Sequence, residues 1–258
     1  LYFCRAGSPA GGGFLTPAAA ALLSGAMPAR ANGQETHPQS APEEAGPRDR
    51  AAPAAPSKLP AELGRRVDGI QKRYENLVDF RARFVQESRL QAASGARTAK
   101  GEVFFQKPGR MRWRYESPDP QDILIRDGKF WQYVPADNQV VIQRMDTSRV
   151  EYAFLTGLGE LTSQFDIRWA RPRRRPGSPL DYLALTPKDK EATFAEVLIG
   201  VDDKQRILVT EVTDFLGNVT VLRFEGLEDN VGVGKERFQW ENPAGADVID
   251  MSAGFQAP

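Results

Sequence analysis

Cysteine and histidine, residue types often used for nucleophilic, acid–base and metal chemistry, each occur once in this sequence. The cysteine is Cys4 and the histidine is His37, and both lie in an N-terminal stretch with the composition of a removable or disordered segment. A disulfide needs two cysteines, a zinc cluster needs several Cys or His ligands, and a Ser–His–Asp triad needs a histidine in the fold. We therefore expect no enzymatic activity, no metal site and no cofactor.

Two pairs of adjacent carboxylates are the remaining candidates for general acid–base or metal chemistry. Glu43 and Glu44 lie in a proline-rich segment, whereas Asp202 and Asp203 lie where a hairpin turn is expected. Both settings favour solvated side chains over catalysis or metal binding.

The strongest charge cluster is the arginine cluster, which we define as Arg171, Arg173, Arg174 and Arg175. Two interpretations stay open. A solvated loop is the more common outcome for such a run, and a docking patch for acidic head groups or for a protein partner is the alternative.

The overall composition is that of an ordinary globular protein. Of the 258 residues, 26% are charged and 41% are hydrophobic, and the formal net charge is zero. Binding to nucleic acid without sequence preference requires a basic excess, so we expect no nucleic-acid partner. The sequence has no apolar run long enough for a transmembrane helix.

Residues 1–31 have features of an export signal peptide. A small, apolar stretch covers residues 14–23, and an Ala-x-Ala sequence that ends at Ala31 fits the pattern that precedes signal-peptidase cleavage. We expect cleavage after Ala31. The alternative is an alanine-rich disordered leader.

A proline- and alanine-rich segment follows the leader. Residues 32–57 contain no aromatic residue and little that could be buried, which predicts a disordered linker. Almost all aromatic residues lie further along the chain. We therefore expect one folded domain, residues 58–258.

The first ordered element is predicted to be a helix. Its apolar residues recur at spacings of three and four, which places them on one stripe. They are Leu59, Leu63, Val67, Ile70 and Tyr74.

After this helix the hydrophobic period changes to two, which is typical of half-exposed strands. Strand signals recur about every 8–12 residues from Phe80–Phe84 to a last expected strand at Phe238–Trp240. Turn residues lie between them, and Asp127 and Gly128 predict a hairpin turn. Helical spacing returns only at residues 148–163, where we expect one or two short helices. The pattern predicts a mainly β protein with an antiparallel sheet of about eleven strands. A sheet of this width curls on itself, and the helices then lie over its mouth.

One face of this sheet is a candidate for function. In the strand Arg110–Glu116, Met111, Trp113 and Tyr115 point one way while the arginines between them point the other. The pattern alone favours a filled core. About eleven strands, however, enclose more space than side chains need, so an apolar cavity stays open as the alternative.

Several motifs, taken in order, resemble the periplasmic outer-membrane lipoprotein carrier family, LolA. The segments that carry the resemblance are Phe80–Gln86, Lys107–Trp113, Asp127–Pro135, Asp214–Asn218 and Pro243–Ile249. Single motifs such as the Lys-Pro-Gly turn are weak signals, but the ordered set covers nearly the whole predicted domain.

The resemblance implies an unclosed antiparallel β-barrel with an α-helical lid over an apolar cavity. It also implies a monomeric periplasmic carrier that shuttles triacylated lipoproteins from the inner to the outer membrane. The implied partners are an inner-membrane lipoprotein-releasing ABC transporter and an outer-membrane acceptor, which is a receptor lipoprotein or the membrane itself. The alternative on the same fold is a periplasmic module that senses or assembles lipids or lipoproteins.

The lipid-binding residues follow from the apolar faces described above. The expected lining set is Phe80, Phe84, Met111, Trp113, Ile123, Ile125, Phe154, Leu155 and Leu158. In the family an arginine just before the motif proline helps to hold the lid closed, and this sequence has Lys107 at that position. Lysine lacks the planar fork of five donors, so the resemblance assigns lid gating to Lys107 but leaves its strength open.

Overall fold

A computed structural model of the protein describes residues 59–92, 95–145 and 160–252. They form one twelve-stranded sheet with the strand order β12-β6-β5-β4-β3-β2-β1-β11-β10-β9-β8-β7. The strands are β1 (Asp79–Arg89), β2 (Ala96–Gln106), β3 (Arg110–Ser117), β4 (Gln121–Arg126), β5 (Lys129–Val134), β6 (Gln139–Arg144), β7 (Phe165–Trp169), β8 (Asp181–Pro187), β9 (Phe194–Val201), β10 (Ile207–Asp214), β11 (Val219–Asp229) and β12 (Asp247–Asp250). The helices are α2 (Ala61–Asn76), α4 (Leu161–Gln164) and the 3-10 turns η1 (Pro135–Asp137) and η2 (Lys235–Phe238).

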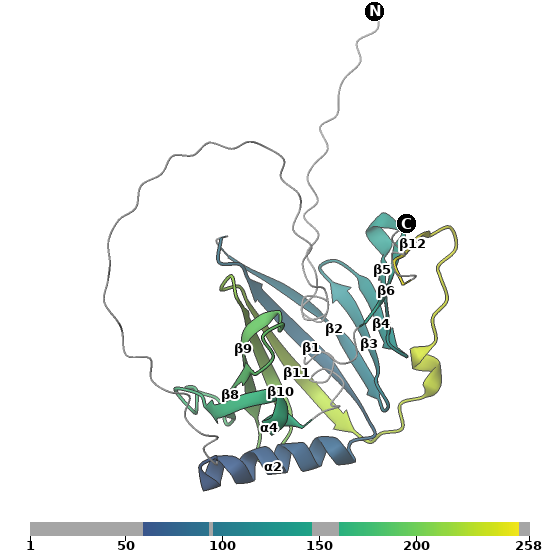
Figure 1. Ribbon diagram of the computed structural model, residues 1–258. Helices are drawn as coiled ribbons and strands as arrows, with labels where there is room; N and C mark the ends of the chain where they lie inside the picture. The colour runs from purple at the N-terminus through teal and green to yellow at the C-terminus, as the bar shows by residue number, and fades with distance from the viewer. Residues whose placement is uncertain (1–58, 93–94, 146–159, 253–258) are drawn as a thin grey trace, which may run out of the picture.

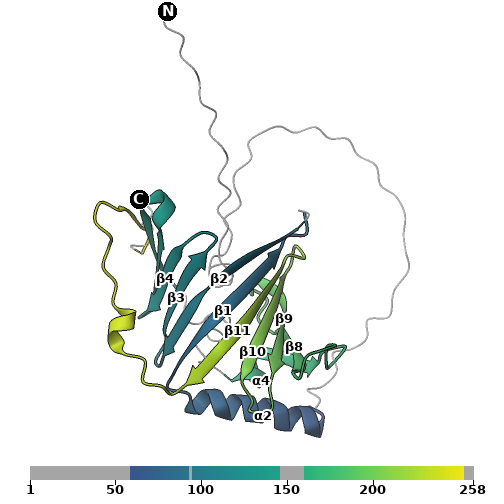
Figure 2. The same ribbon diagram turned by 180° about the vertical axis from the view of Figure 1, so that it is seen from behind.

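The sheet is curled but not closed, because β7 and β12 are its two edges. Figure 1 shows the two halves of the sheet rising from helix α2, and the view from behind in Figure 2 shows the neighbouring strands side by side. Every hydrogen-bonded pair of strands is antiparallel except β12 and β6, which are parallel. The predicted class, a mainly β protein with an unclosed antiparallel sheet, is confirmed.

Turn chemistry fixes the register of the hairpins. Asp127 and Gly128 between β4 and β5 both have positive φ, at 53° and 69°. Two positive φ values in a two-residue loop give the turn whose twist matches that of the flanking strands. Across this turn Ile125 of β4 pairs with Phe130 of β5. On the neighbouring pair β3 and β4, Met111 lies opposite Ile125 and Trp113 opposite Ile123.

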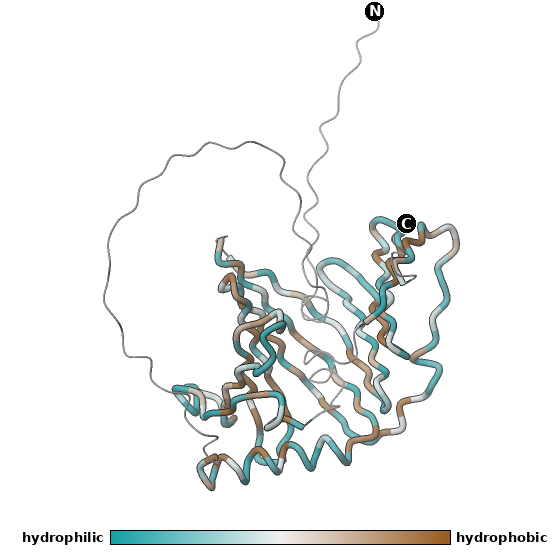
Figure 3. The backbone as a smooth tube through the Cα atoms, viewed as in Figure 1, coloured by the Kyte–Doolittle hydropathy of each residue, from teal (hydrophilic) through white to brown (hydrophobic). Residues whose placement is uncertain are grey.

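Helix α2 begins directly after Pro60, which suits a first helical turn. Its stripe buries Leu63, Val67 and Ile70 against the sheet, and these side chains are at most 2% exposed. Figure 3 shows hydrophobic and hydrophilic residues alternating along α2. The helix lies across one end of the strands (Figure 1). The spacing of its apolar residues predicted the buried stripe but not this position.

The inner face of the sheet carries two hydrophobic clusters. The first cluster lies on β1–β5 with Leu222 of β11, and the second lies between α2 and β7–β10. Tyr74, near the end of α2, packs against both clusters. Helix α2 therefore covers one half of the inner face and only reaches the margin of the other.

The expected last strand, Phe238–Trp240, is wrong. Phe238 ends the 3-10 turn η2, and it packs with Phe104 and Leu124 on the outer face of the sheet. Trp240 stacks on Trp131 of the same face with ring centroids 6.4 Å apart. These two aromatic residues alternate because both pack against the outer face of the sheet, not because they belong to a strand. The last strand is β12.

Some expectations fall outside the described residues. They are the leader 1–31, the linker 32–57 and most of the helical segment 148–163. Within that last segment the described part contains the short helix α4. In the parts of the chain that the structure describes, no helix is long and apolar enough to cross a membrane.

Two glycine-to-alanine substitutions test this packing, because they should change the free energy of unfolding in opposite directions. A Cβ at Gly101 of β2 would lie 2.0 Å from the carbonyl oxygen of Arg114 and 2.9 Å from the Phe84 ring. Because the neighbouring backbone must shift, we expect Gly101→Ala to lower the free energy of unfolding by about 3 kcal/mol. Gly64→Ala in α2, where the nearest atom lies at 4.0 Å, should raise it by about 0.5–1 kcal/mol. Urea denaturation measures both, and equal effects would contradict this packing.

Candidate functional site

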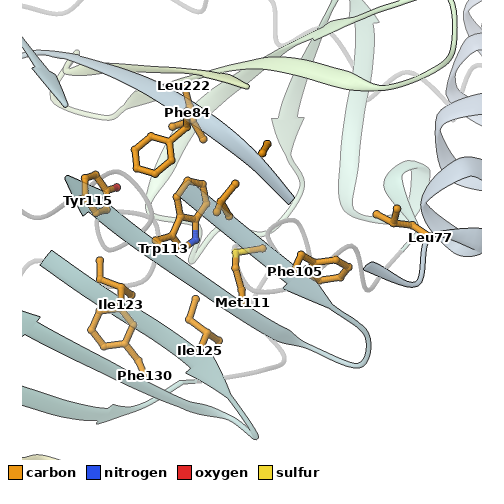
Figure 4. Close-up of a cluster of buried hydrophobic side chains, with 12 residues drawn as sticks. Leu77, Phe84, Phe105, Met111, Trp113, Tyr115, Ile123, Ile125, Phe130 and Leu222 are labelled. Atoms are coloured by element: carbon orange, nitrogen blue, oxygen red, sulfur yellow. The ribbon is translucent and has the colours of Figure 1, made fainter. Parts of the chain in front are cut away.

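The candidate site is the first cluster on the inner face of β1–β5. Its buried members are Leu77, Ala82, Phe84, Val103, Phe105, Met111, Trp113, Tyr115, Ile123, Ile125, Phe130 and Leu222. Figure 4 shows these side chains converging from adjacent strands. These side chains form a continuous apolar patch on this half of the inner face, with the buried Gln86 of β1 beside it.

Six of the nine expected lining residues lie together in this cluster. Phe84, Met111, Trp113, Ile123 and Ile125 are buried members, and Phe80 is partly buried and packs against them. Phe154, Leu155 and Leu158 lie outside the described residues. The positions of the six confirm the predicted inner face, whereas their role in lipid binding stays a prediction.

Aromatic contacts order the centre of the cluster. The Phe84 ring meets Trp113 and Tyr115 edge-on, with centroids 5.1 and 4.9 Å away. Edge-to-face packing at these separations is the favoured geometry for aromatic pairs. Gly101, opposite Phe84 on β2, leaves the space that this ring needs.

Sequence reasoning missed part of the cluster. Val103 and Phe105 alternate along β2 on the same face as the expected residues, and this alternation was the available signal. Tyr115 was expected on this face but not in the lining set, and its hydroxyl donates to Gln86 at 2.8 Å. Burial raises the pKa of Tyr115, so this hydroxyl stays a neutral donor.

The indole N–H of Trp113 is an unpaired donor within the cluster. The side chain is 2% exposed, and its Nε1 has no hydrogen-bond partner among the described residues. A buried N–H without an acceptor is unfavourable because it has lost its hydrogen bond to water. A group that brought an acceptor, such as an ester or amide carbonyl, would satisfy it.

Lys107 connects the β2–β3 turn to the end of helix α2. Its Nζ donates to the backbone carbonyls of Tyr74 and Glu75, the latter at 2.9 Å. Carbonyls in the last turn of a helix lack partners within the helix, and a cation is favourable there. Burial lowers the pKa of Lys107, and the nearby charge of Glu75 opposes this shift. The part of the lid segment that Lys107 would gate lies outside the described residues, so its gating role stays a prediction.

The arginine cluster is organised by one buried carboxylate. Asp181 accepts from Arg66 of α2 at 2.8 Å, from Arg173 at 3.1 and 3.2 Å, and from Arg174 at 2.9 Å. Burial raises the pKa of Asp181, but the hydrogen bonds and charges of these arginines outweigh burial and leave the pKa below its ordinary value. Neither sequence interpretation of the cluster anticipated this attachment to α2.

Two further contacts fix the same loop. The Arg173 guanidinium lies 3.7 Å from the centroid of Trp169, and Arg175 pairs with Glu211 at 2.9 Å. Arg171 lines a groove of about 700 Å³ between the start of α2 and β7. The loop therefore holds α2 against the second cluster. None of these contacts involves the first cluster.

Of the paired acids, Asp202 has a structural role, whereas Glu43 and Glu44 lie outside the described residues. Asp202 is mostly buried and accepts from the backbone N–H and from the Nε of Arg206, both at 2.8 Å. These bonds close the β9–β10 turn, where the pair was expected.

The described residues thus form an unclosed, curled sheet with an apolar inner face, which is the architecture of an open-barrel protein. The chain belongs to the LolA family. A family model described as "Outer membrane lipoprotein carrier protein LolA" matches residues 75–241.

Relatives named "Outer-membrane lipoprotein carrier protein" support this membership. The chain is 30% identical over 199 residues to the protein of that name from Alkalilimnicola ehrlichii, with 76% of this chain and 88% of the relative covered. It is 31% identical over 186 residues to that from Nitrosospira multiformis, with 71% and 87% covered. Among solved structures, a LolA superfamily protein from Nitrosomonas europaea matches with a TM-score of 0.41 and 14% identity, over 69% of this chain and 97% of that chain.

The ion-pair centre at Asp181 yields a stability prediction. Asp181→Ala removes the buried carboxylate that Arg66, Arg173 and Arg174 share, and among the described residues only Arg173 keeps a second carboxylate partner, Glu62 at 2.8 Å. We expect a loss of about 3 kcal/mol at neutral pH. The folded pKa is depressed, so the contribution of Asp181 is complete above the ordinary aspartate pKa of about 4 and is lost as the pH falls through the folded value. Urea denaturation of both proteins should therefore show a difference that shrinks at acidic pH.

The matched control is Asp166→Ala on β7. The Asp166 side chain is 79% exposed and lies 3.8 Å from Lys188, so its removal should have no measurable effect. A difference between Asp181→Ala and the unmodified protein that stayed constant with pH would show that the carboxylate charge is not what matters.

Proposed function

We propose that the protein is a periplasmic carrier that binds the acyl chains of lipoproteins on the inner face of its sheet and moves them from the inner to the outer membrane. The observation that carries the proposal is the first cluster, an apolar surface on β1–β5 that lies mostly beyond the reach of α2. Membership of a family of lipoprotein carriers supports the same conclusion.

Binding requires the cluster to open. Trp113 is 2% exposed and Ile123 is fully buried, so an acyl chain reaches them only when the groups that bury them move apart. We propose that the segment 148–163 acts as the lid that moves and that Phe154, Leu155 and Leu158 complete the lining. The unpaired N–H of Trp113 then gives the cavity one donor for an acyl carbonyl.

Cargo must pass directly between binding sites. Exposing one ~16-carbon chain to water costs about 12 kcal/mol, at ~0.8 kcal/mol per methylene. Spontaneous release of two or three chains would therefore be very slow. Uptake needs a partner that supplies energy, because the sequence contains no P-loop motif, and an inner-membrane ABC transporter would meet this need. Delivery needs an outer-membrane acceptor with a stronger hold on the lipid.

A charge in the first cluster should abolish cargo binding. We expect Trp113→Asp to lose binding of a fluorescent acyl-chain probe by at least about 100-fold, because the carboxylate would have to be desolvated beside the chain. Trp131→Asp, which alters the outer face of the sheet, should bind as the unmodified protein does. Far-UV circular dichroism checks that both variants keep the sheet.

A second measurement covers the case in which Trp113→Asp does not fold. Photocrosslinking residues placed singly at Met111 and Ile123 should label a triacylated lipoprotein. Labelling from neither position would contradict the assignment of this surface to cargo.

Lys107 should tune the release of cargo. Arginine at this position presents more donors to backbone carbonyls, so Lys107→Arg should slow the transfer of labelled lipoprotein to acceptor vesicles. Lys107→Leu removes the bonds to Tyr74 and Glu75 and should accelerate it. Lys100→Leu, at an exposed position of β2, is the control. Equal transfer rates in all four proteins would remove Lys107 from gating.

A further inference from the structure

Two large apolar side chains stand out from the tip of the β10–β11 hairpin. Phe215 is 68% exposed and Leu216 is 77% exposed, the highest values among the large hydrophobic residues that the structure describes. Leu90, which is 44% exposed, follows β1 at the same end of the sheet. We call these three residues the apolar tip.

The turns that carry the apolar tip lie side by side. Arg89 pairs with Val219 across β1 and β11, and the backbone N–H of Gln91 donates to the Oδ1 of Asn218 at 2.9 Å. This end of the sheet is opposite to the end that α2 crosses, as Figures 1 and 2 both show. The tip therefore faces away from the helix and from the first residues of β1.

The hairpin turn holds its shape without the side chains of Phe215 and Leu216. The Oδ1 of Asp214 accepts from the backbone N–H groups of Leu216 and Asn218 at 2.8 and 2.9 Å, and its Oδ2 accepts from the Nδ2 of Asn218 at 2.7 Å. Gly217 supplies the positive φ of 80°. Backbone and polar groups thus specify the turn, and the two apolar side chains add exposed surface that the described fold does not use.

We propose that the apolar tip enters the surface of a lipid bilayer. Three side chains expose on the order of 300 Å², whereas a stable protein interface buries about 800 Å² on each partner. The exposed apolar area of the tip is therefore less than half of what a specific protein interface buries on one partner. It suits shallow insertion into lipid, where each apolar side chain that leaves water favours the bound state by roughly tenfold or more.

The proposal extends the carrier function and rests on it only for its biological meaning, which is delivery of cargo at a membrane. Leu90 at the tip lies six residues after Phe84 of the first cluster, which corresponds to about 20 Å of extended strand. Insertion of the tip would therefore hold the first cluster about 20 Å from the bilayer surface. Contact through two or three side chains is weak and reversible, as a shuttling protein requires.

Tryptophan fluorescence tests insertion directly in the full-length protein without cargo. Phe215→Trp should show a blue-shifted emission with vesicles of phosphatidylethanolamine and phosphatidylglycerol, and brominated lipids should quench it. Val78→Trp is the matched control, because Val78 is 57% exposed at the α2 end of the sheet and should show neither effect. Both effects should persist at molar salt, since apolar insertion is not screened.

Vesicle flotation tests the energetic role of the tip. The double variant Phe215→Ser and Leu216→Ser should lose vesicle binding by at least about tenfold, whereas Val78→Ser should not. Unshifted emission of Phe215→Trp would overturn the proposal. A change in the protein's molar mass on mutation of the tip would also overturn it, because the tip would then serve self-association. So would a blue shift of Phe215→Trp emission that appears only when an outer-membrane protein is added. Acyl-probe binding, measured separately, shows whether the carrier function itself fails.

Discussion

The length of helix α2 limits how much of the sheet it can cover. Its sixteen residues span about 24 Å. Strands lie about 4.8 Å apart, so a helix that crosses them covers about five. The sheet has twelve strands, and α2 packs against β7–β10. Tyr74, in its last turn, lies where the second hydrophobic cluster meets the first. The apolar inner face of β1–β5 must therefore be covered by something other than this helix, and the proposed function depends on that requirement.

Polar contacts hold the covered half in place and leave the other half apolar. Asp181 attaches the arginine cluster to α2 at one end of the helix, and Lys107 binds the carbonyls at the other end. Both contacts lie outside the first cluster. Within that cluster the polar groups are few, namely the Tyr115 hydroxyl paired with Gln86 and the unpaired N–H of Trp113. Polar contacts thus fix α2 on β7–β10, whereas β1–β5 keep an apolar inner face on which an apolar ligand can bind.

The sequence predicted the sheet well where alternation was clear. Met111 and Trp113 on β3 and the turn at Asp127 and Gly128 were placed correctly, because alternation and turn chemistry are local properties. The exposed strand β12 gave no alternating signal, because its two apolar residues, Val248 and Ile249, are adjacent. Backbone bonds such as that from the Asp247 N–H to the Asn138 carbonyl hold it. The Asp181 centre was missed because its partner Arg66 is 115 residues away in the sequence. Contacts of that kind arise only from the topology.

Mass spectrometry of the protein purified from the cell envelope tests the central claim most directly. If the first cluster holds acyl chains, the unmodified protein should co-purify with triacylated lipoprotein, and the Trp113→Asp variant should not. An unmodified protein that carried no acylated ligand, even when isolated while lipoproteins are being exported, would contradict the account.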